Sequence, residues 1–500
     1  MSIIRRGALI AACTVLAVVP ASAQGKHHKP AKPVKLAQAV EAQAATPVDT
    51  EPSQPSMTLN EALAIAYETN PQLAAAQAGL RAADEQVAQA NGGWRPTISV
   101  GATYGVEKYF FPGIPVTGFG TISSITDHPL NGQALITQPL FRSGRTIAEI
   151  SRAKALVRSG RAQLTATEQT VLLNSVTAYM NVVRDGAIVK LREHNVEVLR
   201  RQRDSTQLEF KAGSLTRTDV AQSEARLATA QSDLTTAQGQ LATSRADFAQ
   251  AIGRPAETLE KNPDLPKLPS AEDDVLGRAL KLNPDLLTAQ ANERAANYAV
   301  DDAWGAMGPT LSLQGQYNYS QSALNSVVGF GAGGTTPESV TNHGVAVIGQ
   351  LNVPIYQAGV EEANVRQARE LHAQTQLNVA VADRQVRDAV AAAWATYQSA
   401  LGTIASNEAT AKADTIAFEG VSKEQQVGGR TVLDVLNAEQ ELLNAQVALV
   451  SSQRNAVVAA YQVAAASGAL TAQSLGLKVK LYDPLEHYND DAGAFVGFGG

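Results

Sequence analysis

The strongest constraint on the fold of this 500-residue chain is an internal duplication. Asn70-Pro71 and Pro96 return 213 residues later as Asn283-Pro284 and Pro309. Further along, the offset becomes 215 and stays constant. In that register the matched pairs are Gly213 and Gly428, Asp219 and Asp434, Glu224 and Glu439, and Gly253 and Gly468. Because copies of about 210 residues are too long to be solenoid units, each copy is expected to form one structural half of the protein.

The duplication divides the chain into segments of different composition. Residues 1–23 have the pattern of a secretory signal peptide, with two arginines, an apolar stretch and the cleavage site Ala21-Ser22-Ala23. Residues 24–56 are rich in Ala, Pro, Lys and Gln without an apolar period, which predicts a disordered lead-in. The other segments are a first repeat at 57–253, a Pro-rich linker at 254–269, a second repeat at 270–470 and a C-terminal tail at 471–500.

The composition excludes several classes of protein. Cys13 is the only cysteine, so a disulfide framework and thiolate zinc sites are excluded. It ends Ile10-Ala11-Ala12-Cys13, which resembles a lipoprotein processing site, but the apolar run continues past it and favours ordinary cleavage. The net charge of -6 argues against a nucleic-acid-binding protein. The mean hydropathy of -0.11 excludes a helical protein with many membrane spans.

Both repeats predict the same order of elements: a helical stretch, two strands around a Gly/Pro-rich loop, a very long helix, a glycine turn and a medium helix. The helical stretches are expected at 59–91 and 273–306. The strand residues alternate between apolar and small polar types, from 98 to 106 and again from 310 to 319. This alternation is typical of transmembrane β-strands, with lipid on one face and water on the other. A soluble sheet with one buried face has the same pattern.

The long helices are predicted at 145–211 and 360–427, because neither stretch contains proline. Apolar residues recur in sevens, as at Val157, Leu164 and Val171, which indicates coiled-coil packing. Each helix would be roughly 100 Å long at about 1.5 Å per residue. A rod of this kind buries only a stripe, so it needs neighbouring helices.

Four strands are too few to close a barrel, because about eight are needed to leave an interior. A chain with unprotected strand edges must therefore pair with other copies of itself. Three copies would give twelve strands and a ring of helices, so we infer a homotrimer. The predicted fold is a mixed α+β membrane protein, mainly coiled-coil helices with a four-strand contribution to a twelve-stranded β-barrel.

Several motifs make the chain similar to the TolC family of outer-membrane efflux and secretion channels. They are Thr58-Leu59-Asn60-Glu61-Ala62-Leu63, Asn70-Pro71, the strand exit at 138–144 and the run from Val427 to Asn437. The resemblance covers about 57–477. It implies a trimeric β-barrel in the outer membrane and an α-helical tunnel across the periplasm. It also implies a passive duct that docks to an inner-membrane pump, ABC or proton-driven, through a periplasmic adaptor.

Glycines at the two helix reversals supply the backbone freedom that a tight turn needs, namely Gly213, Gly428 and Gly429. Helix caps are expected just after them. The candidates are Thr218 or Asp219 in the first turn and Thr431 in the second. On this reading alone, Asp219 and Asp434 stabilise helix starts through the helix dipole.

The resemblance implies a second role for these turns, because in the TolC family they close the tunnel at its periplasmic tip. Asp434 matches the first aspartate of the family's pore ring, whereas Asn437 stands where the second would be, which implies a weaker cation trap. The family's closing network implies a link between Arg430 and Asp219. Its remaining positions correspond to Gln425 and Thr218.

Two other classes of function remain to be weighed. A soluble periplasmic coiled-coil adaptor or scaffold would share the long helices, but the duplicated alternating strands argue against it. A hydrolase is disfavoured because the sequence has no nucleophile elbow, P-loop, dinucleotide fingerprint or HExxH motif. The sequence therefore predicts a channel with no catalysis and no cofactor.

Overall fold

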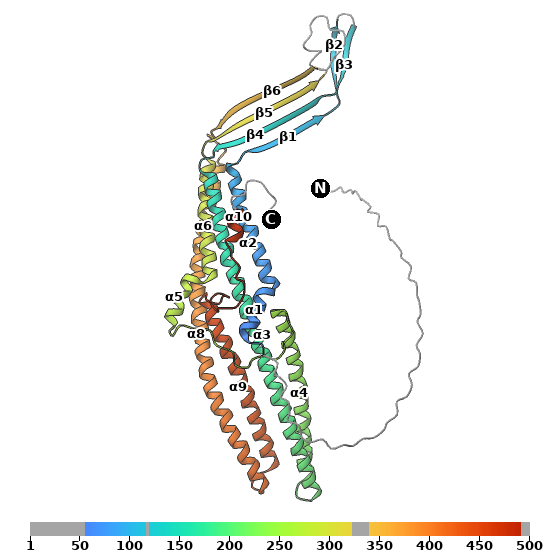
Figure 1. The fold of residues 1–500 in the computed structure, drawn as a ribbon, viewed down its shortest axis with the longest axis vertical. Helices are drawn as coiled ribbons and strands as arrows, with labels where there is room; N and C mark the ends of the chain where they lie inside the picture. The colour runs from blue at the N-terminus through green and yellow to red at the C-terminus, as the bar shows by residue number, and fades with distance from the viewer. Residues whose placement is uncertain (1–55, 117–119, 323–339, 492–500) are drawn as a thin grey trace, which may run out of the picture. The chain divides into compact units, whose positions relative to one another are not determined.

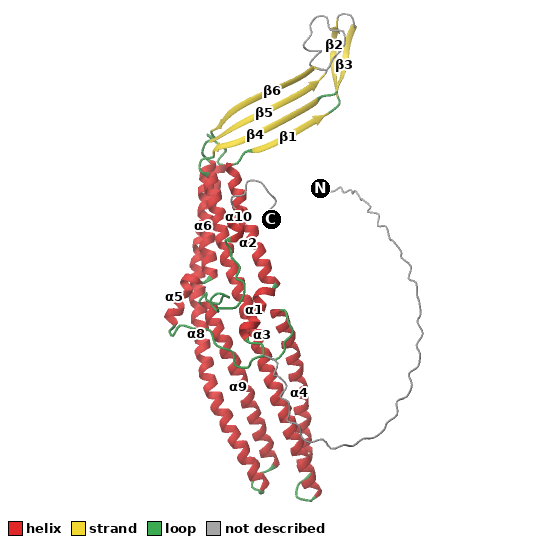
Figure 2. Cartoon of the chain, viewed as in Figure 1, coloured by secondary structure: helices red, strands yellow, loops and turns green. Residues whose placement is uncertain are grey.

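The computed structural model describes residues 56–116, 120–322 and 340–491, and its elements follow the duplicated order (Figure 1, Figure 2). The predicted signal peptide, nearly all of the predicted lead-in and the end of the tail lie outside the described residues. The first repeat contains α1 (Leu59–Thr69), α2 (Pro71–Asn91), η1 (Gly92–Trp94), β1 (Thr97–Tyr104), β2 (Glu107–Val116), β3 (Gly120–Asp127), β4 (Leu130–Phe141), α3 (Arg145–Lys211) and α4 (Arg217–Ile252). The second repeat and the tail contain α5 (Glu272–Leu282), α6 (Pro284–Ala306), β5 (Thr310–Ser322), β6 (Val340–Asn352), α8 (Val360–Gln426), α9 (Val432–Ala466) and α10 (Glu486–Asp491).

The long helices were predicted almost to the residue. α3 has the predicted bounds, and α8 ends one residue before the predicted end. The first helical stretch of each repeat, however, is two helices rather than one. Asn70 and Asn283 cap the second helix of each pair: Asn70 Oδ1 accepts the Gln72 N–H at 2.9 Å, and Asn283 Oδ1 accepts the Asp285 N–H at 3.0 Å. The proline that follows each asparagine cannot continue a preceding helix, so the chain breaks there.

The main core lies where α1, α3, α4 and α9 meet, and it also holds the linker. Its largest fully buried side chains include Tyr179, Phe248 and Tyr461. The Tyr179 hydroxyl lies 2.8 Å from the Met57 carbonyl oxygen and 3.1 Å from that of Glu260. Burial raises the pKa of Tyr461 to about 12, so its hydroxyl stays neutral and remains a hydrogen-bond donor.

α3 and α8 are both 67 residues long but differ in how much of their surface the chain itself covers. Buried residues occur along most of α3, whereas α8 buries only Val365, Ala382, Val386, Val390 and Ala411. Apolar side chains elsewhere on α8 are exposed, for example Leu377 at 69%. The uncovered face of α8 therefore lacks the partner that a coiled-coil stripe requires.

The main sheet is antiparallel, with the strand order β1-β4-β5-β6, so β4 and β5 join the two repeats. Its register places apolar residues of neighbouring strands opposite one another. One such row runs across the sheet through Val100, Ala134, Tyr317 and Val345. Polar residues such as Gln133 and Asn318 pair in rows of the opposite face, as the alternation predicted.

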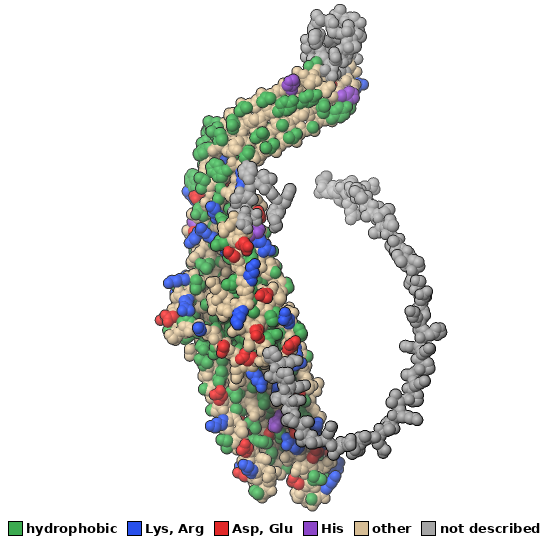
Figure 3. All heavy atoms as spheres, viewed as in Figure 1, with side chains coloured by type: hydrophobic (Ala, Val, Ile, Leu, Met, Phe, Trp, Pro, Cys, Tyr) green, Lys and Arg blue, Asp and Glu red, His purple; other side chains and the backbone are tan. Residues whose placement is uncertain are grey.

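Within the described residues, neither face of this sheet is covered by a helix. All eight residues of β1 are exposed, including Val100 at 80%, and Val345 of β6 is 78% exposed. Figure 3 shows apolar side chains gathered along the strands on the face in view, whereas charged side chains gather over the helices. The soluble alternative, in which one face of the sheet is buried, therefore does not describe this chain.

The first loop differs from the prediction, because it contains a second, two-stranded sheet formed by β2 and β3. Its residues alternate less regularly than those of β1, and the register shifts between Phe110 and Ile114. Gly113 lies in this irregular stretch with a φ of 86°, which a glycine adopts without strain.

Among the described residues, none of the helices combines the length and the apolar character needed to cross a bilayer.

We expect Gly468→Ala to destabilise the protein more than Gly253→Ala. Both glycines have positive φ, 77° and 86°, which costs an alanine about 1–2 kcal/mol. A Cβ at Gly468 would lie 2.5 Å from the backbone oxygen of Leu282, whereas at Gly253 it would meet the movable Thr69 side chain at 2.9 Å. Melting followed by circular dichroism measures the difference. Equal decreases in melting temperature would contradict this reasoning.

Candidate functional site

The two helix reversals, between α3 and α4 and between α8 and α9, have the same backbone geometry. Gly213 and Gly428 have φ of 84° and 80°. Their N–H groups donate to the carbonyls of Phe210 and Gln425, both at 2.9 Å. The next N–H in each turn reaches back five residues, from Ser214 to Glu209 O at 3.0 Å and from Gly429 to Glu424 O at 2.8 Å. Each turn is therefore a Schellman motif, which satisfies carbonyls that the helix end leaves free.

The positive φ at Gly213 and Gly428 favours glycine at these positions, whereas the backbone at Gly429 does not require it. Gly429 has no positive φ, and Ser214 occupies its position in the first turn. A Cβ at Gly429 would lie 3.3 Å from the Glu424 carbonyl oxygen, which is close but tolerable with a small shift.

A capping box begins the helix after each turn, and it corrects the predicted cap of α4. Thr216, rather than Thr218 or Asp219, is the N-cap residue of α4, and Asp219 completes the box from the third helical position. Thr431 caps α9 as predicted, with Asp434 in the equivalent place. The Thr216 N–H donates to Asp219 Oδ2 at 2.9 Å, and the Asp219 N–H donates back to Thr216 Oγ1 at 3.3 Å.

The capping boxes also fix the charge of the two aspartates. Hydrogen bonds from the Thr216 side chain and backbone lower the pKa of Asp219. Hydrogen bonds from the Thr431 backbone and side chain lower the pKa of Asp434. Both carboxylates are therefore ionised at neutral pH. The helix-start role and a charged role at the tip are compatible, because the same hydrogen bonds serve both.

Of the remaining predicted site residues, Arg430 and Asn437 have side-chain partners within or beside the turns. Within one chain, Arg430 Nε donates to Glu424 Oε2 at 2.9 Å, so its partner is Glu424 rather than Asp219. Asn437 accepts a hydrogen bond from Arg226 of α4 at 3.2 Å. Thr218 is exposed and Gln425 is half-buried.

Sequence reasoning missed a second contact between the repeats, made by the residue two positions after Asn437. Asn195 of α3 donates to the buried carboxyl of Glu439 on α9 at 3.2 Å. The duplication pairs Glu439 with Glu224, but Glu224 is exposed. The identity of the two residues therefore gave no indication that only one would be buried.

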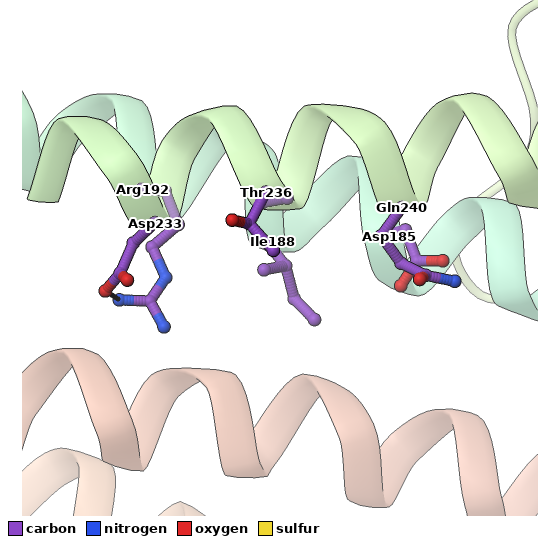
Figure 4. A pocket seen from close by; sticks show the side chains of 7 residues that line it. Asp185, Ile188, Arg192, Asp233, Thr236 and Gln240 are labelled. Atoms are coloured by element: carbon purple, nitrogen blue, oxygen red, sulfur yellow. Dashed lines mark hydrogen bonds and ion pairs between the residues drawn. The ribbon is translucent and has the colours of Figure 1, made fainter.

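A groove follows α3 and α4 further from the turns. Figure 4 shows Asp185, Ile188 and Arg192 of α3 and Asp233, Thr236 and Gln240 of α4 lining it. Arg192 and Asp233 form an ion pair at 2.8 Å across the two helices. In the part of the chain that the structure describes, no group of three His, Cys, Asp or Glu residues has the geometry of a metal site.

Long paired helices joined to a four-stranded sheet with two uncovered faces define an outer-membrane channel with a periplasmic helical extension. The family model described as outer membrane efflux protein matches residues 62–254 and 275–469. The chain belongs to this family of channel proteins, which confirms the resemblance found in the sequence. The two matched ranges correspond to its two repeats.

Individual relatives agree over most of the chain. Outer membrane efflux protein BepC of Brucella suis is 34% identical over 433 residues, 87% of this chain and 90% of that protein. Outer membrane protein TolC of Escherichia coli is 25% identical over 419 residues, 81% of each chain. The crystal structure of the outer membrane protein VceC from Vibrio cholerae has the same fold, with a TM-score of 0.68 at 20% identity over 82% of this chain and 96% of that chain. The soluble adaptor alternative is therefore not favoured.

We expect Thr216→Ala to loosen the start of α4 and Thr218→Ala to leave it unchanged. Losing an N-cap hydroxyl costs about 1 kcal/mol, or about fivefold in a local opening equilibrium. Amide hydrogen exchange over the first turn of α4, including the Asp219 N–H, measures it. Faster exchange in Thr218→Ala alone would instead identify Thr218 as the helix cap, as predicted from the sequence.

Proposed function

We propose that three copies of this chain form one channel, in which twelve strands close a barrel and the helices close a tunnel. The observation that carries the proposal is the uncovered sheet, whose edge strands β1 and β6 have free edges within the chain. Pairing β1 of one copy with β6 of the next satisfies the backbone groups of both edges. The same arrangement places other copies against the uncovered face of α8.

We further propose that the channel is a passive exit duct. The rods would cross the periplasm and meet an adaptor, and through it an ABC or proton-driven pump in the inner membrane. The names of the relatives, efflux protein and outer membrane protein, support transport across the outer membrane. In this proposal residues 1–23 direct export, 24–56 lead into the first repeat at 57–253, the linker at 254–269 joins it to the second repeat at 270–470, and the tail at 471–500 follows.

The gate is proposed at the turns. Three copies of Asp434 near one axis would form a ring of carboxylates, kept ionised by their capping boxes, with Asn437 one helical turn further on. Closure would involve Arg430, which exchanges Glu424 for Asp219 when neighbouring turns come together. Thr218 and Gln425 lie at the same turns and would line this contact. Because none of these side chains is buried, each link is weak, which suits a gate that a docked partner opens.

The first experiment tests assembly. We expect the protein to fractionate with the outer membrane, to require detergent for extraction and to run as a heat-sensitive trimer. Placing a charge in the apolar row with Val100→Asp should reduce trimer yield severalfold, since a charged side chain on the lipid face destabilises a transmembrane β-barrel. Thr103→Asp, on the polar face of the same strand, is the matched control. A stable monomer released without detergent would contradict the proposal.

The second experiment tests the gate. We expect the double variant Arg430→Ser with Asp219→Ala to raise single-channel conductance severalfold in planar bilayers, because it removes both partners of the proposed closing link. Glu424→Gln is the control, since it removes only the partner of Arg430 within the turn. If Glu424→Gln alone reproduced the increase, closure would depend on the turn itself and Asp219 would have no part in it.

A further inference from the structure

The boundary between the two repeats contains a buried carboxyl group that is only half satisfied. Glu439 of α9 is 6% exposed and Asn195 of α3 is 3% exposed. Asn195 Nδ2 donates to Glu439 Oε1 at 3.2 Å, but the other carboxyl oxygen, Oε2, is buried and has no hydrogen-bond partner among the described residues. Burying a carboxylate in this state is costly, whereas a neutral carboxyl is tolerated.

The surroundings of Glu439 are apolar. An apolar cluster joins α3, α4 and α9 beside it, and its buried members are Val196, Leu199, Leu227, Ala230, Val432 and Leu436. Burial among such residues raises the pKa of Glu439, and the hydrogen bond from Asn195 and the charge of His194 only partly offset this. The equivalent residue of the first repeat, Glu224, is exposed, and no such environment surrounds it.

The contact between Glu439 and Asn195 lies close to the helix reversal at the tip. Glu439 follows Asp434 and Asn437 on α9, within the first turns after the helix reversal. Its contact joins the α3–α4 pair to the α8–α9 pair, and Arg226 to Asn437 crosses the same boundary. A movement that separates the two helix pairs near the tip must break the contact with Asn195 and expose the carboxyl group of Glu439 to water.

We propose that Glu439 is a positioning residue of the closed tip and couples closure to pH, because its neutral carboxyl holds α9 against α3 and its ionised form favours separation. This inference rests on the proposed closure of the channel at its helical tip. It assigns to Glu439 a role that the pore ring and the turn residues do not have.

The direction of the pH dependence follows from burial. While Glu439 is buried against Asn195 its pKa is raised, and in a form in which the two helix pairs are separated its pKa would return towards the ordinary value of about 4.3. Closure is therefore fully supported below about pH 4.3, and that support is lost as the pH rises through the raised value.

Other charged groups lie near the contact between Asn195 and Glu439. On α3 the exposed His194 favours the ionised form of Glu439 when it is protonated. On α4 Arg226 is engaged by Asn437. The antiparallel pairing of α8 with α9, fixed by Asn407 Nδ2 on Ala448 O at 3.3 Å, brings Lys412, Asp414 and Glu419 of α8 alongside this part of α9. None of these groups donates the missing hydrogen bond to Oε2.

The test is the open probability of the full-length trimer in planar bilayers between about pH 4.5 and 8, the range in which a buried glutamate titrates. We expect the open probability of the wild type to rise severalfold towards the upper end, and Glu439→Gln to stay closed throughout. Glu224→Gln, at the equivalent exposed position, is the matched control and should follow the wild type. Asp434→Asn, which removes the charge of the proposed pore ring, shows how much of the pH dependence comes from that ring.

Glu439→Leu serves as a second neutral variant if Glu439→Gln fails to assemble, and it too should show no rise with pH. A rise with pH in either neutral variant that matches the wild type would overturn the role of Glu439 while leaving the channel intact. A wild type with no pH dependence would overturn it as well. An open probability that responds to neither pH nor the Arg430 and Asp219 substitutions would instead overturn closure at the tip, and the role of Glu439 with it.

Discussion

A sheet with two free edges and two uncovered faces cannot be the whole of a stable structure, and the rest of this molecule depends on that fact. The edges carry unpaired backbone N–H and C=O groups, which are costly wherever water is excluded. Four strands cannot curl far enough to pair their own edges. Because β4 and β5 pair across the two repeats, each chain supplies one continuous section of sheet. The remaining hydrogen bonds must come from other copies.

The need of the sheet for partner copies extends to the long helices, because each long helix is connected to a strand by a short joint. Ser143 and Gly144 before α3 both have positive φ, 50° and 83°, and Ala358 and Gly359 before α8 repeat the pattern with 51° and 79°. Such φ values are rare for residues other than glycine, so their recurrence at the 215-residue offset marks one joint built twice. In the first joint the Ser143 hydroxyl donates to the Pro309 carbonyl at 2.6 Å, which ties this joint to the connection between α6 and β5 in the second repeat.

The sequence was sufficient wherever the relevant information was local or duplicated. Proline-free heptads defined α3 and α8, and the glycines of both turns lie where the left-handed backbone needs them. The cap of α4 could also have been found, because Thr216 and Thr431 share the 215-residue offset. The hairpin of β2 and β3 and the break between α1 and α2 at Asn70 were not predicted, because the local sequence preferences at both places favour more than one structure. The burial of Glu439 could not be predicted, because the same residue type at Glu224 is exposed, and only the packing of α3 against α9 distinguishes them.

This asymmetry between duplicated parts explains why the moving helix of the proposed gate would belong to the second repeat. α3 is covered along most of its length by its own chain, whereas α8 has five buried residues in the same 67. Moving α8 therefore disrupts little of the chain's own core, whereas α9 is packed into that core and can move only where its contacts with α3 and α4 are broken. Near the turns, the polar contacts that oppose such movement are Asn195 with Glu439 and Arg226 with Asn437. The contact of Glu439 leaves one carboxyl oxygen unsatisfied. An incompletely hydrogen-bonded contact between the two helix pairs therefore lies beside the residues that would line the pore.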